Sequence, residues 1–145
     1  MKRKIYQTLL EWKNRSAGTS AIMLDGARRV GKSYIAEEFA KREYESYLLI
    51  DFATVTKDVK RFFNDYLGDL DMFFMYLLGA YKTTLTPRKS VIIFDEVQLC
   101  PRARASVKYL VEDGRYHFLE TGSLVSIQEN VGGIVNPSEE EHVKM

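Results

Sequence analysis

Residues 26–33 read Gly-Ala-Arg-Arg-Val-Gly-Lys-Ser and match the pattern G-x-x-x-x-G-K-[ST] at every fixed position. The glycines Gly26 and Gly31 permit backbone angles that turn successive N–H groups toward one centre, where they hold phosphate oxygens. Lys32 would neutralise the β- and γ-phosphates of a nucleotide, and the Ser33 hydroxyl would ligate Mg²⁺. The pattern therefore predicts a phosphate-binding loop, completed by the N-terminus of the helix that follows it.

The whole loop is expected to contact the nucleotide. A glycine turn with a solvated lysine would be the alternative, but an apolar run precedes the loop and a helical pattern follows it, as the mechanism requires. The two arginines inside the loop would reach phosphates, contact an acidic partner or form a solvated basic rim, and the sequence leaves this open. The predicted nucleotide-binding residues are Gly26, Ala27, Arg28, Arg29, Val30, Gly31, Lys32, Ser33 and Tyr34.

Two carboxylates, Asp95 and Glu96, directly follow the apolar run at residues 91–94. Ligands of open α/β sheets bind at the carboxyl ends of the strands, where the phosphate-binding loop should also lie. Asp95 would hold Mg²⁺, while Glu96 would orient and polarise the attacking water, which together with Lys32 would make the site catalytic. The alternative is that both are solvated carboxylates at a strand end.

A third polar segment, Thr121-Gly122-Ser123, follows the predicted strand at residues 116–119. Thr121 and Ser123 are candidate catalytic residues, because a polar side chain there would contact the γ-phosphate or the attacking water. Such a segment is also ordinary turn material. The two histidines, His117 and His142, stand alone, and with one cysteine the chain has no zinc-binding spacing.

Short apolar runs alternate with segments of helical periodicity, which predicts an α/β fold with a parallel sheet covered on both faces. On the last predicted helix, Arg102, Arg104 and Lys108 are expected to form the solvent-exposed face. The predicted strands are residues 21–24, 47–50, 91–94 and 116–119, with a fifth around 143–145. The predicted helices cover residues 4–13, 33–44, two stripes within 57–81 separated at Gly68, and 101–113.

The composition indicates a single soluble domain over residues 1–145, because 46% of the residues are hydrophobic and 28% are charged. The net charge of +1 gives no general reason to bind nucleic acid or acidic lipid. The most apolar stretch, residues 70–81, contains Asp71 and is shorter than the roughly 20 residues that span a bilayer. Cys100 has no partner for an intrachain disulfide, so we expect a cytoplasmic location.

The loop, the Asp-Glu pair and the polar residue after the next strand together resemble ATPases of the additional-strand, catalytic-glutamate division. More narrowly, the chain resembles the prokaryotic AAA-type ATP-binding proteins, whose N-terminal P-loop domain precedes an uncharacterised C-terminal region. The matching stretches are LLEWK (9–13), DGARRVGKS (25–33), IFDEVQLCP (93–101), VKYLVED (107–113), TGSLVSI (121–127) and PSEE (137–140).

The resemblance implies a three-layer P-loop NTPase fold with strand order 5-1-4-3-2, which binds ATP and Mg²⁺. It also implies a region beyond Met145 that ATP would drive or gate, and through which self-association or partner binding would occur. Ring-forming relatives place an arginine finger before the fifth strand, but no Arg or Lys lies between Thr121 and Glu141. We therefore expect slow hydrolysis by this chain alone.

Two other functions remain open from the sequence: a small-molecule P-loop kinase, and an ATP-gated binding module without useful turnover. The acidic, arginine-free segment after Thr121 disfavours the kinase, which would need an arginine-rich lid, and Glu96 is better suited to activating water. No Asn-Lys-x-Asp element of the guanine-reading kind is present, which favours ATP over GTP.

Overall fold

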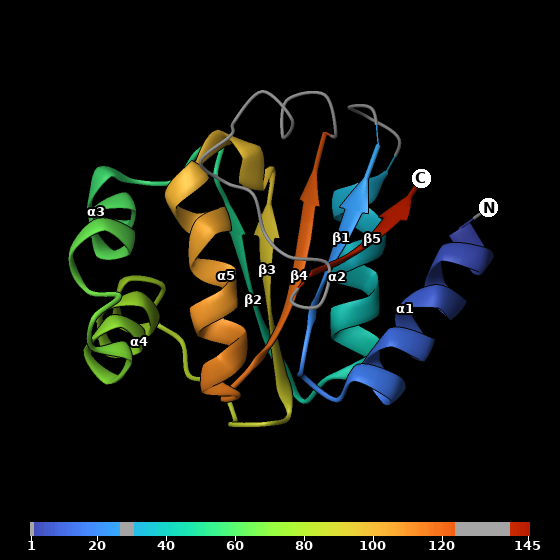
Figure 1. Ribbon diagram of the computed structural model, residues 1–145, viewed down its shortest axis with the longest axis horizontal. Coiled ribbons are helices and arrows are strands. Elements are labelled where there is room, and N and C mark those ends of the chain that lie inside the picture. The colour runs from blue at the N-terminus through green and yellow to red at the C-terminus, as the bar shows by residue number, and fades with distance from the viewer. Residues whose placement is uncertain (1, 27–30, 124–139) are drawn as a thin grey trace.

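Five parallel strands form one sheet in the computed structural model, which describes residues 2–26, 31–123 and 140–145. The spatial order is β2-β3-β4-β1-β5, which confirms the order expected from the sequence. All strands run in one direction, so their carboxyl ends meet at a single edge (Figure 1). The strands are β1 (Ala21–Asp25), β2 (Ser46–Asp51), β3 (Ser90–Asp95), β4 (His117–Gly122) and β5 (Glu140–Lys144).

Helices cover both faces of the sheet, which gives the predicted three-layer α/β architecture (Figure 1). Every residue of β1 and β3 is buried, as expected for strands with a helical layer on each side. One face packs against α1 (Lys2–Ser16) and α2 (Lys32–Glu43), and the other against α3 (Lys57–Asp65), α4 (Leu70–Ala80) and α5 (Pro101–Asp113).

Successive strand residues point to opposite faces of the sheet, and each face forms its own apolar core with the helices that cover it. On the α1/α2 side, Leu9 and Trp12 pack with strand residues such as Ile93, and the Trp12 indole donates a hydrogen bond to the Ser20 carbonyl at 3.1 Å. On the other side, the rings of Phe63 and Phe94 meet edge to face at 5.6 Å. These cores fix the helices against the sheet because aromatic side chains bury large apolar areas.

Local signals set where the helices begin and end. The Thr56 hydroxyl accepts a hydrogen bond from the Val59 amide at the start of α3, and Asp69 caps α4 in the same way through the Met72 amide. Pro101 occupies the first turn of α5, which needs no amide donor there. None of the described helices combines the length and apolar character needed to cross a membrane.

Two sequence expectations need correction, and one element was missed. Thr121 and Gly122 belong to β4 and do not form a turn after it, because they pair with Leu24 and Asp25 of β1. Arg104 is 5% exposed and so does not share the solvent-exposed face of α5, whereas Arg102 and Lys108 are exposed as predicted. A short 3₁₀ helix, Val97–Leu99, also lies between β3 and α5 and was not predicted.

Candidate functional site

The N-terminus of α2 lies at the carboxyl edge of the sheet, immediately after the loop pattern. Gly31 caps the helix with φ 90° and ψ 19°, a left-handed conformation that glycine adopts without strain. The first turn therefore begins at Lys32, with its free amide groups at this edge. Tyr34 follows with a 62% exposed side chain. The predicted contacts of Ala27, Arg28, Arg29 and Val30 lie outside the described residues.

The Lys32 side chain is almost completely buried and spans the gap between two strands. Its ammonium group donates hydrogen bonds to the backbone oxygens of Gly26 at 2.7 Å and Gly122 at 2.9 Å. Its Nζ atom also lies 3.8 Å from the Glu96 carboxylate. The Lys32 ammonium group, which the loop pattern predicts to bind phosphate, therefore lies at the carboxyl ends of β1 and β4, beside Asp95 and Glu96.

Asp95 joins the loop to two neighbouring strands. Its Oδ1 atom accepts a hydrogen bond from the Ser33 hydroxyl at 2.6 Å and another from the Thr121 hydroxyl at 2.6 Å. Ser33 comes from α2, Asp95 from β3 and Thr121 from β4. The fold therefore brings Ser33 and Thr121, 88 positions apart in the sequence, to the same carboxylate. Ser33 and Thr121, from two of the segments expected at this edge, thus donate to the same oxygen of the third.

The Ser33 hydroxyl and the Asp95 carboxylate fit a Mg²⁺ ion chemically. Magnesium prefers hard oxygen ligands and, in nucleotide sites, takes one or two from the protein and the rest from phosphates and water. The two oxygens are already adjacent, at 2.6 Å. Among the residues that the structure describes, no group of three His, Cys, Asp or Glu side chains could hold a metal by itself. The protein would supply only part of the coordination.

Glu96 has a backbone conformation that turns it out of the strand direction. Its φ of 55° and ψ of 49° are in the left-handed region, which a non-glycine residue rarely adopts and which is often found at functional sites. The Glu96 amide donates to the Thr121 hydroxyl at 2.9 Å, which fixes this turn. The carboxylate accepts a short hydrogen bond, 2.6 Å, from the side-chain amide of Gln98.

The two residues predicted from the 121–123 segment are placed differently. The Thr121 hydroxyl is fully buried, gives its only proton to Asp95 and accepts from the Glu96 amide, so it positions both acidic residues. Ser123 follows the end of β4 and is partly exposed at the same edge. The contact of Gln98 with Glu96 was not predicted, since a glutamine two residues after the acidic pair forms no recognisable sequence motif.

A second group of charged residues lies on the other face of the sheet. Arg104 of α5 donates to the Glu140 carboxylate of β5 at 2.7 Å, and His142 is also 2.7 Å from that carboxylate. Glu120 of β4 is fully buried beside them. This group, which we call the Arg104 cluster (Arg104, Glu120, Glu140 and His142), holds the last described strand to α5 and was not predicted from the sequence.

The two glutamates of the Arg104 cluster titrate in opposite directions. Burial raises the pKa of Glu120 well above its ordinary value, and the neighbouring Glu140 raises it further. Burial also acts to raise the pKa of Glu140, but the interactions with the neighbouring Glu120 and His142 and the charge of Arg104 outweigh it and lower that pKa. Glu120 therefore carries the proton, and Glu140 carries the charge that pairs with Arg104.

The glycine-capped helix, the buried lysine and the shared Asp95 define a nucleotide-binding P-loop module. A family of AAA domains matches residues 18–133, and the chain belongs to this family. Among solved structures, the chain is similar to PCH-2 of C. elegans, with 14% sequence identity and a TM-score of 0.48. That similarity covers 99% of this chain and 42% of the PCH-2 chain. A search among curated proteins finds no match.

Proposed function

We propose that this chain is a Mg²⁺-dependent ATP-binding module that hydrolyses ATP slowly and drives or gates a further, C-terminal region. The observation that carries the proposal is the position of Asp95, which accepts hydrogen bonds from both Ser33 of the P-loop helix and Thr121 of β4. The Asp95 carboxylate thereby links the start of α2, which we expect to bind phosphate, to the carboxyl edge of the sheet. Membership in the AAA domain family supports ATP as the nucleotide.

Each residue has a distinct role in this proposal. The amides at the start of α2 would bind phosphate oxygens, and Lys32 would move from the carbonyls of Gly26 and Gly122 to the β- and γ-phosphates. Ser33 and Asp95 would hold the Mg²⁺ ion, which would neutralise phosphate charge as the bond breaks. Ser123, at the end of β4, is the remaining candidate for a phosphate contact.

Glu96 would act on the attacking water. Its carboxylate lies 3.8 Å from the Lys32 ammonium, so it is close to the expected position of the terminal phosphate. A carboxylate there accepts a proton from water as the oxygen attacks phosphorus, and the leaving ADP takes the electron pair of the broken P–O bond. No Arg or Lys lies between Thr121 and Glu141 to stabilise this charge, which supports slow turnover by the isolated chain.

Nucleotide binding is tested with Lys32→Ala. Loss of the ammonium group should abolish measurable ATP binding in isothermal titration calorimetry, because no other described basic side chain contacts this part of the site. Lys60→Ala, on the exposed surface of α3, is the matched control and should bind like the wild type. An unchanged dissociation constant for Lys32→Ala would contradict the assignment of the site.

Hydrolysis is tested with Glu96→Gln, which keeps the side-chain shape but cannot accept the proton. We expect ATP affinity to remain and phosphate release to fall by about 10²-fold or more, the usual contribution of a general base. Unchanged release would refute the role of Glu96. If the wild type binds ATP but releases no phosphate, it is an ATP-gated binding module, and strict dependence on an added small-molecule acceptor would identify a kinase.

A further inference from the structure

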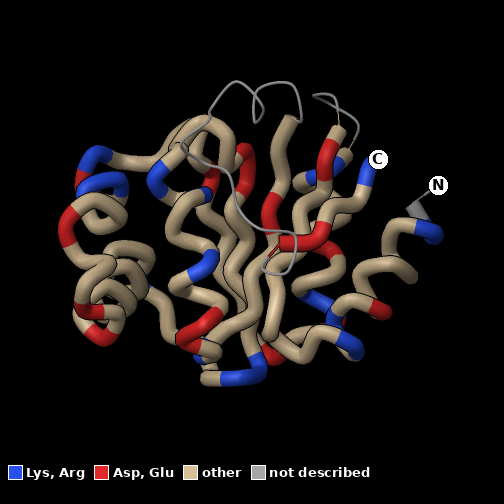
Figure 2. Tube along the Cα trace, viewed as in Figure 1, with Lys and Arg blue, Asp and Glu red and all other residues tan. Residues whose placement is uncertain are grey.

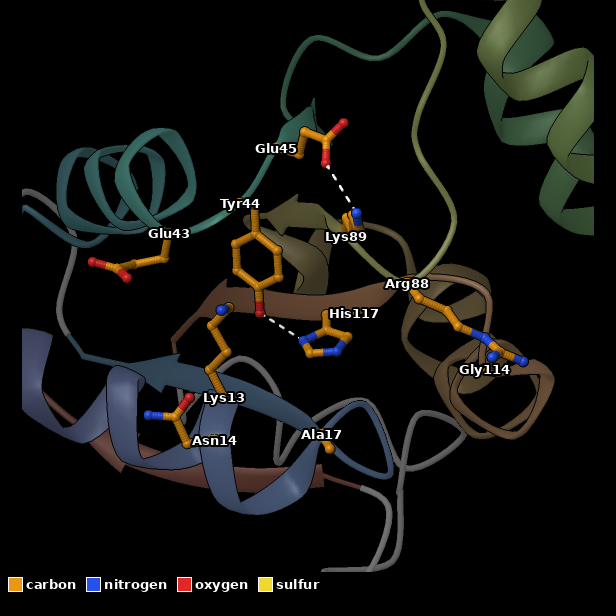
Figure 3. Close-up of a pocket in the computed structure, with 10 residues that line it drawn as sticks. All are labelled: Lys13, Asn14, Ala17, Glu43, Tyr44, Glu45, Arg88, Lys89, Gly114 and His117. Atoms are coloured by element: carbon orange, nitrogen blue, oxygen red, sulfur yellow. Dashed lines mark hydrogen bonds and ion pairs between the residues drawn. The ribbon is translucent and has the colours of Figure 1, made fainter.

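A cavity of about 760 Å³ lies at the amino-terminal edge of the sheet, at the opposite ends of the strands from the P-loop (Figure 3). It is formed where α1, the end of α2 and the beginnings of β3 and β4 meet. Its volume is within the range of about 300–1,000 Å³ that is typical of small-molecule sites. The lining residues are Lys13, Asn14, Ala17, Glu43, Tyr44, Glu45, Arg88, Lys89, Gly114 and His117.

The charges around the cavity favour an anion. Glu43 accepts a hydrogen bond from Tyr6, outside the lining, and its carboxylate is turned away from the centre in Figure 3. Glu45 is 3.8 Å from Lys89. In contrast, Lys13 and Arg88 have no acidic partner among the described residues, and the Lys13 ammonium lies 5.0 Å from the centre of the Tyr44 ring. Residues 88–89 form a basic stretch at the lower edge in Figure 2.

His117 contributes a partly buried imidazole ring. The Tyr44 hydroxyl lies 2.6 Å from its Nδ1 atom (Figure 3). Burial lowers the pKa of His117, with a smaller contribution from Lys13, whereas burial raises the pKa of Tyr44. When the Tyr44 hydroxyl donates this bond to Nδ1, the imidazole proton lies on Nε2. The Nε2 atom has no hydrogen-bond partner among the described residues.

The backbone around the cavity is also unusual. Ala17 and Arg88 have positive φ angles, 49° and 66°, and only four described residues other than glycine do so. Glu96, at the candidate nucleotide site, is another of these four residues. Gly18 has φ 88°, and a Cβ atom there would lie 3.1 Å from His117 Nε2, so glycine leaves this donor uncrowded. Strained backbone held in place by the fold is characteristic of binding sites.

We propose that this cavity binds a small organic anion that carries a phosphate or carboxylate group. The anion would accept a hydrogen bond from His117 Nε2 and interact with the positive charges of Lys13 and Arg88. This site is separate from the P-loop and does not depend on ATP hydrolysis. Inorganic phosphate and citrate are the probes, because they represent the two kinds of anionic group.

The experiment follows the imidazole signals of His117 by NMR while each probe is added. The chain has two histidines, so His142, which is bonded to Glu140, serves as an internal reference. We expect saturable shifts of the His117 signals with a Kd below about 1 mM for one probe. The probe that binds identifies the anionic group. Choline, a cation, should cause no shift.

Variants assign the binding to this cavity. Arg88→Gln and Lys13→Gln should each weaken the affinity by about tenfold, the typical effect of losing one charged contact. Lys60→Gln, elsewhere on the exposed surface, should leave it unchanged, and so should Lys32→Gln, which alters the P-loop. All four variants change side chains outside the apolar cores, and circular dichroism checks that they fold.

Absence of a saturable His117 shift with both probes would overturn the proposal. A shift whose affinity is unaffected by Arg88→Gln and Lys13→Gln would also overturn it, because the anion would then bind elsewhere. Loss of the His117 response in Lys32→Gln would show that the probe acts through the P-loop, again against a separate site. A failure of ATP binding by the wild type would leave this result untouched, so the two proposals fail independently.

Discussion

Two ion pairs in this chain differ in how firmly their partners are held. Lys32 and Glu96 are 3.8 Å apart, and each has stronger bonds to other groups: the lysine to two backbone carbonyls and the glutamate to Gln98. Arg104 and Glu140 are in direct contact at 2.7 Å, with side chains 6% and 0% exposed. Each charge of the first pair therefore keeps a hydrogen bond when the pair separates. Separation of the second pair leaves Glu140 bonded to His142 but leaves the buried Arg104 side chain with no acceptor among the described residues.

This difference matches what each region does in the fold. A site that takes up a phosphate tail must release its lysine, so bonds that are replaced at small cost suit it. The Arg104 cluster joins α5 to β5, at the edge of the sheet, and a buried ion pair resists the loss of one partner because the remaining charge is costly. Three substitutions test this contrast.

The largest effect is expected from Arg104→Met. Glu140 would keep its charge without its main partner, and the free energy of unfolding should fall by about 3–5 kcal/mol. Urea unfolding at neutral pH measures this. Arg102→Met, two residues away on the exposed side of α5, removes a hydrogen bond to Asn64 and should cost under about 1 kcal/mol.

A double variant, Arg104→Met with Glu140→Leu, sharpens the test. Removing both charges should recover most of the lost stability, since apolar replacement of a buried pair is often neutral. If the double variant is no more stable than the single one, Arg104 acts through packing and the contrast between the two pairs fails.

An intermediate effect is expected from Gln98→Ala, and it rests on the proposed hydrolysis. Loss of the hydrogen bond to Glu96 should lower kcat for phosphate release by about tenfold and leave KM unchanged. The fold should tolerate this change, because the buried Oε1 atom of Gln98 has no hydrogen-bond partner within residues 2–26, 31–123 and 140–145. Leu99→Ala on the same 3₁₀ turn is the control. Faster release in Gln98→Ala would show that the glutamine restrains Glu96 instead of positioning it.

The smallest effect is expected from Glu120→Gln. Because the pKa of Glu120 is raised in the folded state, its protonated form is stable at low pH, and the chain loses stability as the pH rises through that pKa. The glutamine variant keeps the size of the side chain but cannot ionise. It should be more stable than the wild type at about pH 9, by on the order of 1 kcal/mol, and similar at about pH 4.

Glu141→Gln is the matched control for this pH series. Its pKa is lowered, chiefly by the hydrogen bond from Arg15, so its contribution is present above the ordinary carboxyl pKa and is lost as the pH falls. Both variants should therefore differ from the wild type at high pH but in opposite directions, Glu120→Gln being more stable and Glu141→Gln less stable, and both should approach the wild type at low pH. Parallel stability curves for Glu120→Gln and the wild type would contradict burial as the cause of its raised pKa.

Much of the fold could be predicted because its signals are local. The apolar runs of the strands and the helical spacing of residues such as Val107 and Leu110 are confirmed, since buried apolar side chains repeat with the period of their element. The convergence of Ser33 and Asp95 also followed, because parallel strands carry their ligands at one edge.

The parts that could not be predicted depend on distant partners. Arg104 is buried only because Glu140, 36 positions later, meets it. Thr121 and Gly122 have the composition of a turn, but pairing with β1 keeps them in the strand. Gln98 and the cavity at the amino-terminal edge have no sequence pattern, because their roles arise from segments that only the tertiary structure brings together.

The two hydrogen bonds of Lys32 have a consequence for the arrangement of the strands. A single ammonium group bridges the ends of β1 and β4 where their own ladder stops, so these ends are cross-linked through a side chain. A molecule that draws the ammonium group away leaves the Gly26 carbonyl oxygen to be hydrated, whereas the Gly122 oxygen keeps a hydrogen bond from the Gly26 amide at 3.2 Å. The side-chain link between the two strand ends is then lost and this single backbone bond remains, so the stiffness of this edge depends on whether the site is occupied.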